Sequence, residues 1–518
     1  MSDLSLPNVR DRFRRASARR RQWESLWRDC FAYALPLRGS GLNTGQGPGR
    51  ISPETMYDGT AADAVEQLAA SLLAQLTPPS SEWFGFKPVP GLEPDVSAHL
   101  APSLDQAAAI ALKHFERSNF AVEMHQCFLD LVTVGTATML FEEAPAGNAS
   151  AFTFQAVPTA EITIESGAHG CATGHFRTSQ LTGSELLARY PEAPIPAPAS
   201  ASDAESFAAC RIDVVEAVLP GEGEFSYLAY AENVGGNGSV ELARGQFARS
   251  PFITFRWLKG AGELYGRSPV MTALPDIKTT NKVVELVLKN ASIAVSGIWQ
   301  LEDDGALNPA NIKLVPGAII PKSPGGGGLT PLASPGRFDV SQLILDDFRA
   351  RIRRTLMVDQ LGPVAGARMT ATEVLQRSAE ATRLLSAVYG RLQGELINPL
   401  LRRAQTILAR RGEIPPFRLD GIVADIEHRS PLARLQARED VQNTLMWLET
   451  AQKMGPEALA HVDLGEAITW LGERLGVPDR LVRSSDRLIE GLLGEAIDTL
   501  ENVTEPDPGP DVMKGGAR

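Results

Sequence analysis

The sequence predicts an α+β protein that is predominantly α, and three observations support this fold class. Apolar residues recur at helical spacing in the first third of the chain, in a central segment and again in the last third. Between residues 132 and 256, apolar and polar residues alternate in short runs separated by Gly and Asn, as in strands joined by turns. At 518 residues the chain is also too long for one hydrophobic core, so three or four structural regions are expected.

The composition is that of a folded soluble protein with an acidic balance. Hydrophobic residues make up 43% of the chain, charged residues make up 22%, and the net charge is −12. This charge disfavours tight binding of nucleic acid over a wide surface, although such a protein could still let DNA move past it without holding the DNA. The four cysteines contain no Cys-x-x-Cys pair, which fits a reducing cytosol. We see no signal peptide and no apolar run of the ~20 residues that a membrane span needs.

The first helix is expected over residues 8–33, where the pattern is basic and amphipathic. Eight arginines lie between Arg10 and Arg28, and Trp23 and Trp27 share the apolar side with Leu26 and Cys30. Two interpretations follow. The arginines could form a nucleic-acid-binding arm, or they could be a solvated face over a tryptophan anchor.

The next segments alternate between helix and strand. A second helix is expected over residues 60–76, where Ala and Leu lie on one side and the prolines of "TPPSSEWFGFKP" end the helix. Residues 103–131 again favour helix. Strands are expected at "AFTFQAV", "EITIES", "RIDVVEAVL" and "FSYLAYAE", and the Pro/Ala stretch Pro191–Ser202 is expected to be a surface loop.

A central helix is expected over residues 268–296. Ser268 suits the N-cap, Pro269 suits the first helical position, and Pro275 should kink or restart the helix. Beyond Pro275 the helix has two different faces. One is an apolar stripe of Ile277, Val284, Leu288, Ala291 and Val295, and the other is a polar stripe of Lys278, Lys282, Glu285 and Lys289.

The remainder of the chain is expected to be mainly helical after a short β-like region at 296–340. A helix is expected over 341–357, and Thr370 and Glu373 form a capping box for a helix over about 371–411 that only Pro399 interrupts. Such a helix would span roughly 60 Å, so it needs neighbours along its length and indicates assembly. Ser430 and Pro431 start another helical region, with apolar stripes at 441–448 and 489–500.

No enzymatic motif can be defended. The glycine-rich "KSPGGGGLTP" lacks the Gly-Lys-Ser/Thr ending of a phosphate-binding loop, and neither His-Glu-x-x-His nor Gly-x-Ser-x-Gly occurs. In "HGCATGH", His169, Cys171 and His175 could ligate zinc, but a fourth ligand is not evident and the glycines favour a β-turn. We therefore expect no enzyme activity, no metal and no cofactor.

Six segments, taken together, resemble the portal, or head-to-tail connector, proteins of short-tailed double-stranded DNA bacteriophages. They occur in the family's order and cover most of residues 20–440. They are "WESLWRDCFAYALP", "MYDGTAADAVEQLAASLLAQLTPPSSEWF", "SNFAVEMHQCFLDLVTVGTATML", "PFITFRWLKGAGELYGRSPVMTALPDIKTTNK", "MTATEVLQR" and "SPLARLQ". The chain departs from the family at Pro191–Ser202, which matches no family motif, and at its short C-terminal tail, which is not expected to form a long helical barrel.

The resemblance implies the portal fold, assembled as a ring, normally of twelve subunits, around a central channel. It implies a wing at 1–267, a descending stem helix at 268–296, a clip at 297–340 and an ascending stem helix at 341–357. It further implies a tunnel loop at 358–370, a kinked long wing helix and return at 371–429, a helical crown at 430–500 and a flexible tail at 501–518.

The resemblance also implies roles for residues. Lys278, Lys282 and Lys289 of the stem would face the channel and touch DNA weakly, or would pair with Glu285 on a face between subunits. The apolar stripe from Ile277 to Val295 would pack on neighbouring stems. Gly362, Gly366 and Arg368 would belong to a tunnel loop that contacts DNA, and Trp299, Ile319, Ile320 and Gly326 would belong to the docking surface of the clip.

The implied partners are other copies of the chain, the double-stranded DNA in the channel, the terminase motor, the tail adaptor and tail proteins, and the major capsid and scaffolding proteins. The protein would lie at the portal vertex of the virion, without a membrane, after synthesis in the host bacterial cytoplasm. Two alternatives remain, an arginine-armed nucleic-acid-binding protein that forms no ring and a hydrolase with an unrecognised site.

Overall fold

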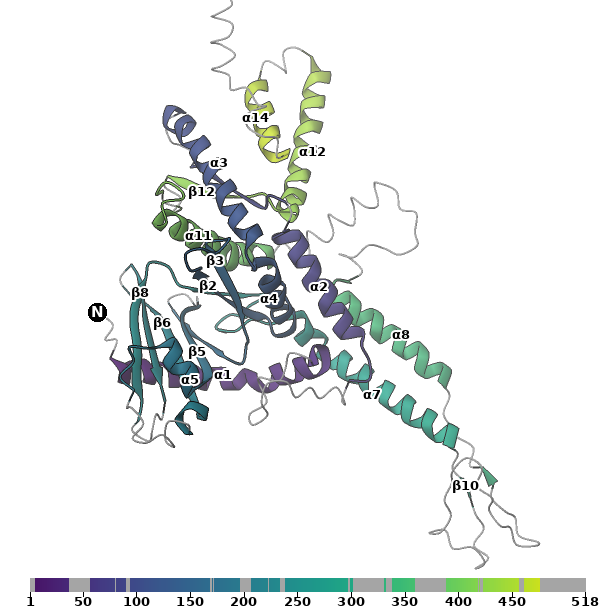
Figure 1. Ribbon diagram of the computed structural model, residues 1–518. Helices are drawn as coiled ribbons and strands as arrows, with labels where there is room; N and C mark the ends of the chain where they lie inside the picture. Colours follow the sequence, from purple (N-terminus) through teal and green to yellow (C-terminus); the bar gives the residue numbers. More distant parts are fainter. Residues whose placement is uncertain are drawn as a thin grey trace, which may run out of the picture. The chain divides into compact units, whose positions relative to one another are not determined.

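A computed structural model of the chain shows a mixed arrangement of helices and strands (Figure 1). The structure describes residues 5–36, 56–79, 81–89, 94–167, 170, 172–195, 206–221, 223–232, 238–296, 299–300, 330–331, 338–358, 388–417, 419, 423–455 and 461–475. They divide into two compact units, Met1–His428 and Arg429–Arg518. None of the helices in these ranges has the length and apolar character needed to cross a membrane.

In the described residues before position 136, the chain forms four helices. They are α1 (Leu6–Ala34), α2 (Thr60–Leu76), α3 (Pro94–Arg117) and α4 (Phe120–Val134). The first two confirm the predicted helices, and the bounds of α2 agree with the prediction. The helical character predicted for 103–131 is confirmed, and the segment is divided between α3 and α4. The chain breaks at Asn119, whose side chain hydrogen-bonds both the N–H and the carbonyl of Phe154.

Two antiparallel sheets occupy the region of predicted strands. The three-stranded sheet has the order β3 (Phe152–Val157), β2 (Thr136–Glu143) and β9 (Phe252–Arg256). The five-stranded sheet has the order β4 (Ile162–Ser166), β5 (Ala172–Thr182), β6 (Arg211–Pro220), β7 (Phe225–Ala231) and β8 (Val240–Phe247). The alternating apolar pattern therefore predicted strands correctly.

Helices cover the five-stranded sheet through apolar side chains. Val9 and Ala16 of α1 belong to one core cluster with residues of β5, β6 and β7, and Phe13 packs on Phe176 with ring centroids 5.5 Å apart. The short helix α5 (Gly183–Arg189) contributes Leu186 to a second cluster with β6 and β7. Burial of these side chains stabilises the sheet, at about 1.5–3 kcal/mol for each large one.

A further strand pair joins distant parts of the chain. β1 (Phe84–Pro88) pairs antiparallel with β12 (Ala424–His428), so that Phe84 lies opposite His428. The sequence did not predict this pairing.

The helix predicted over 371–411 is described only in its second part. Residues 371–387, including the predicted capping glutamate, lie outside the described residues, but helical structure is present from 388 to 410.

The predicted interruption at Pro399 takes the form of a π-helix. The π-helical segment η6 (Gln393–Ile397) runs directly into α11 (Asn398–Arg410). Pro399 has no N–H to donate to the carbonyl four residues earlier, and a local change in hydrogen bonding of this kind is a common response. The helical path continues, so Pro399 alters the winding without ending it.

Two long helices and a small strand pair continue the first unit. α7 (Pro269–Ser296) and α8 (Phe338–Thr355) lie side by side in Figure 1, and β10 (Trp299–Gln300) pairs antiparallel with β11 (Thr330–Pro331). Both predicted helices are confirmed, with α8 beginning slightly earlier than expected. α7 continues through Pro275, so the expected restart of the helix does not occur, although Pro275 lacks the N–H that would pair with the carbonyl of Met271.

The second unit contains α12 (Pro431–Met454) and α14 (Leu464–Leu475), which contact one another. α12 begins at the predicted proline. Its expected apolar stripe is only partly covered, because Val441 is buried whereas Leu445 is 45% exposed. The stripe predicted at 489–500 and the tail at 501–518 lie outside the described residues.

Candidate functional site: the paired central helices

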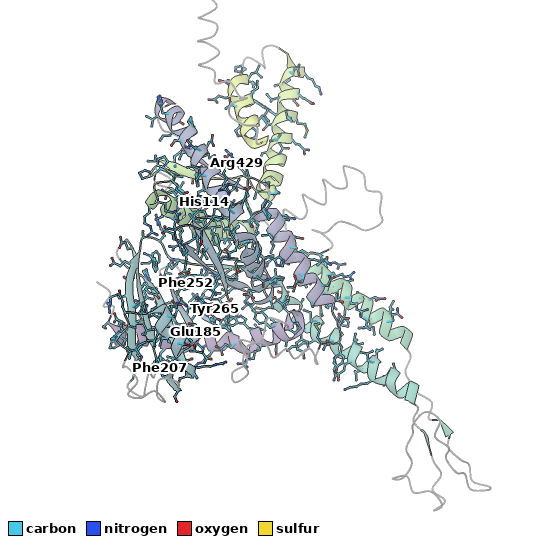
Figure 2. All side chains as sticks on the ribbon, in the orientation of Figure 1. His114, Glu185, Phe207, Phe252, Tyr265 and Arg429 are labelled. Atoms are coloured by element: carbon cyan, nitrogen blue, oxygen red, sulfur yellow. The ribbon has the colours of Figure 1, made fainter. Side chains whose placement is uncertain are left out.

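The segment before α7 fixes where that helix begins. The Ser268 hydroxyl accepts a hydrogen bond from the N–H of Met271 at 2.9 Å, which confirms the predicted N-cap, and donates to the carbonyl of Thr133 at 2.8 Å. Tyr265, labelled in Figure 2, is 1% exposed and packs edge-on against Trp27 of α1 with centroids 5.0 Å apart. These contacts attach the start of α7 to α1 and α4.

The first half of α7 lies against the body of its own chain. Ile277 is buried, and the side-chain oxygen of Asn281 accepts hydrogen bonds from the N–H groups of Tyr57 and Asp58 at 2.6 and 3.1 Å. The Lys278 ammonium donates to Asp29 of α1 at 2.6 Å and lies over the ring of Tyr33. Its predicted contact with DNA is untested, but the structure gives Lys278 a partner within the chain.

Two arginines of α8 hold the helix pair in place. Arg349 donates two hydrogen bonds to one carboxylate oxygen of Asp58, at 2.7 and 2.9 Å, and Arg351 lies 3.2 Å from the Asp276 carboxylate of α7. Burial alone would raise the pKa of Asp58, but hydrogen bonds from Thr60 and Arg349 hold the pKa below its usual value. Neither pair could be predicted from local patterns, because the members of each pair are far apart in the chain.

The second half of α7 leaves the body and exposes apolar side chains. Leu286 and Leu288 are 49% and 52% exposed, and on α8 Leu343 and Ile344 are 75% and 43% exposed. The described part of a single chain thus leaves several large apolar side chains of the helix pair exposed. Exposed apolar groups of this kind mark surfaces that contact another molecule.

The remaining lysines of the predicted polar stripe form ion pairs along the helix. Lys282 and Lys289 both donate to the Glu285 carboxylate, at 2.9 and 2.5 Å, and both lysine side chains are 62% exposed. These hydrogen bonds hold the pKa of Glu285 below its usual range. The pairing agrees with the alternative in which Glu285 serves both lysines, and it leaves both ammonium groups accessible to a further partner.

Several predicted site residues cannot be placed. Gly362, Gly366 and Arg368 of the tunnel loop, and Ile319, Ile320 and Gly326 of the clip, lie outside the described residues. Val284 and Ala291 are half-buried on α7, whereas the side chains of Val295 and Trp299 are not described. The predicted roles of all these residues therefore stay predictions.

Two arginines of α1 contact β4 and the turn that precedes it. Arg12 forms a hydrogen-bonded ion pair with Glu165 of β4 at 2.6 Å, and Arg20 donates to the carbonyls of Thr159 and Ala160. Trp27 is fully buried. These contacts favour the interpretation of α1 as a charged helix over a tryptophan anchor rather than as a nucleic-acid arm.

The possible zinc cluster is not assembled in the described residues. His169 and Cys171 lie outside them, and no group of three His, Cys, Asp or Glu side chains within the described ranges could hold a metal. His175 is 3% exposed in β5, stacks on Phe252 at 5.7 Å (Figure 2 labels Phe252), and has no hydrogen-bond partner for either ring nitrogen in this part of the chain. His175 is therefore placed as a core residue.

Burial of His175 predicts a specific acid sensitivity. Burial lowers the pKa of His175 to about 4, against ~6.5 in an unfolded chain. The folded state disfavours the proton, so stability is complete above pH ~6.5 and falls as the pH drops toward 4, by about 3 kcal/mol in all. We expect His175→Leu to remove this part of the pH dependence in urea unfolding measured from pH 7 to pH 4. Parallel stability curves for the two proteins would contradict the prediction.

A pocket of about 1030 Å³ lies between α1, the segment 259–267 and the start of α7. Glu263 is the only acidic residue among the described residues that line the pocket, and its carboxylate pairs with Arg267 at 2.6 Å. The hydrogen bond from Arg267 lowers the pKa of Glu263. A general acid would need a raised pKa, so this pocket does not support the hydrolase alternative.

Comparison with known proteins defines the class of this chain. Residues 6–482 match the family model described as "Bacteriophage head to tail connecting protein", and the chain belongs to this family. The match spans the helix pair, both sheets and the described part of the second unit. The predicted resemblance to head-to-tail connector proteins is therefore confirmed.

Individual relatives agree with this assignment. The chain is 24% identical over 486 residues to the "Probable portal protein" of Bordetella phage BPP-1, covering 89% of this chain and 86% of the relative. It is 24% identical over 406 residues to the "Portal protein" of Enterobacteria phage T3, and the match covers 76% of this chain and 73% of the relative. Among solved structures, the neck of an empty GTA particle matches 81% of this chain and 90% of that chain at 13% identity, with a TM-score of 0.33, a level that does not define a fold.

Proposed function

We propose that this chain is the subunit of a portal ring at one vertex of a phage capsid, where the ring forms the channel for DNA entering and leaving the head. Family membership supports the head-to-tail position. The observation that carries the proposal is the half-exposed helix pair. Leu286, Leu288 and Leu343 are each at least 49% exposed on elements that are otherwise well attached to the body. Neighbouring copies would bury them.

The regions of the subunit would take the roles that the resemblance implied. α7 and α8 would be the descending and ascending stem, with the clip between them, the wing built from the rest of the first unit, and the crown built from the second unit. The clip would dock the terminase motor during packaging and the tail adaptor afterwards. The ring would also meet the capsid and scaffolding proteins during assembly.

The direct test is microscopy of the purified chain combined with light scattering. We expect closed rings with a central hole and about twelve copies, since heterologous contacts that close generate cyclic assemblies. Leu288→Asp should abolish the rings by placing a charge in the contact, and should leave a folded single chain. Leu187→Asp, at a leucine that is 45% exposed on α5, is the matched control and should still form rings. A wild-type chain that stays a compact monomer at high concentration would contradict the proposal.

A further inference from the structure

The exposed faces of α7 and α8 carry opposite charges at matching heights. On α7, Lys282, Leu286 and Lys289 are spaced four and three residues apart and so share one side of the helix. On α8, Leu343, Asp346 and Asp347 lie away from the buried Leu345 and are exposed. Each face therefore combines a large apolar residue with charge, positive on α7 and negative on α8.

Contacts within the chain set the relative height of these residues. Arg351 of α8 pairs with Asp276 of α7, and Arg349 reaches Asp58, whose N–H is held by Asn281 of α7. The two helices run antiparallel, so moving about six residues outward on each brings Lys282 to the level of Asp346. Leu286 and Leu343 then lie within about one helical turn, ~5.4 Å, of the same level.

The exposed aspartates of α8, Asp346 and Asp347, have little charge compensation among the described residues. Asp346 is 65% exposed at its side chain and lies 3.9 Å from Arg349, which is more closely engaged with Asp58. Asp347 has no ion-pair partner among the described residues, and it is exposed. Asp346 thus has one cation at the long distance of 3.9 Å and Asp347 has none among the described residues, whereas Lys282 and Lys289 share the single carboxylate of Glu285.

We propose that the α7 face of one subunit packs on the α8 face of the next, with Lys282 against Asp346 and Asp347 and with Leu286 against Leu343. This inference rests on the proposed ring and assigns the lysine to the contact between subunits rather than to the channel. A two-fold contact of the α7 face with itself would oppose lysine to lysine. The head-to-tail contact brings unlike charges together, keeps neighbouring copies at one height, and so favours closure of a ring.

Charge reversal tests this contact. Lys282→Glu alone, and Asp346→Lys with Asp347→Lys, should each shift ring formation to a roughly tenfold higher protein concentration at low salt, because like charges then face one another. The triple variant with all three changes should recover rings at close to the wild-type concentration. All altered side chains are exposed, so circular dichroism should show that each variant folds. Adding Glu192→Lys to Lys282→Glu, which introduces a lysine on a distant exposed turn, should give no recovery.

The outcomes separate this inference from the proposed function. If the wild-type chain forms rings and the triple variant is no better than the single reversals, the assigned contact is wrong and the ring stands. If Lys282→Glu leaves ring formation unchanged at low salt, the contact is likewise refuted. If the wild-type chain forms no ring under any condition, the proposed function itself fails.

Discussion

A Glu395→Ala variant is expected to lose about 3–5 kcal/mol of stability, because it strands a buried arginine. Arg256 of β9 is 3% exposed, and its Nε, one terminal nitrogen and its backbone N–H all donate to the Glu395 carboxylate, at 3.0, 2.6 and 3.1 Å. Its other terminal nitrogen donates to the carbonyls of Gly170 and Leu264. Without the carboxylate, the guanidinium charge stays in the protein interior without compensation.

The measurement is urea unfolding at one fixed protein concentration, since assembly would add to the apparent stability. Glu241→Ala is the matched control, because Glu241 also makes a two-point contact with an arginine, Arg244, but on an exposed surface. We expect that change to cost no more than about 1 kcal/mol. Equal losses for the two variants would mean that burial of Arg256 does not govern the energy of its pair.

The position of Glu395 also shows why part of this fold escaped prediction. Local signals identified α2, the strands and the cap at Ser268, because spacing and capping chemistry act over a few residues. The pairing of β1 with β12 and that of Arg256 with Glu395 join residues more than a hundred positions apart. No local pattern encodes such pairs. The only sequence signal for the π-helix that contains Glu395 was the proline at position 399.

The central helix illustrates the same limit for the candidate site. Its apolar stripe was predicted as one surface for packing on neighbouring subunits. In the structure Ile277 is buried within its own chain, whereas Leu288 is 52% exposed. Periodicity identifies the side of a helix that is apolar, but not the residue at which the helix leaves the body. The lysines illustrate the same limit. Lys278 pairs with Asp29 of another helix, which no local pattern predicts, whereas Lys282 pairs with Glu285 in the next turn of α7.

Gly266→Ala is expected to have the second large effect, a loss of more than about 4 kcal/mol or failure to accumulate as folded protein. A Cβ atom at Gly266 would overlap the carbonyl oxygen of Gly135 and lie 2.9 Å from its carbonyl carbon. Gly135 ends α4 with φ of 76°, a left-handed conformation that favours glycine. Its carbonyl also accepts a hydrogen bond from Trp257, while the Gly266 N–H donates to Thr136.

Neither backbone segment can therefore move aside without losing a hydrogen bond or the C-cap of α4. The measurement is the yield of soluble protein and its thermal midpoint, with Gly390→Ala as the control, because a Cβ at Gly390 meets no atom within 4 Å and alanine favours helix. We expect the control to be neutral or slightly stabilising. The contact lies three residues before the start of α7 at Pro269. Any Gly266→Ala protein that does fold should therefore have a displaced helix pair and should not close into rings. A Gly266→Ala variant with wild-type stability and normal rings would contradict the prediction.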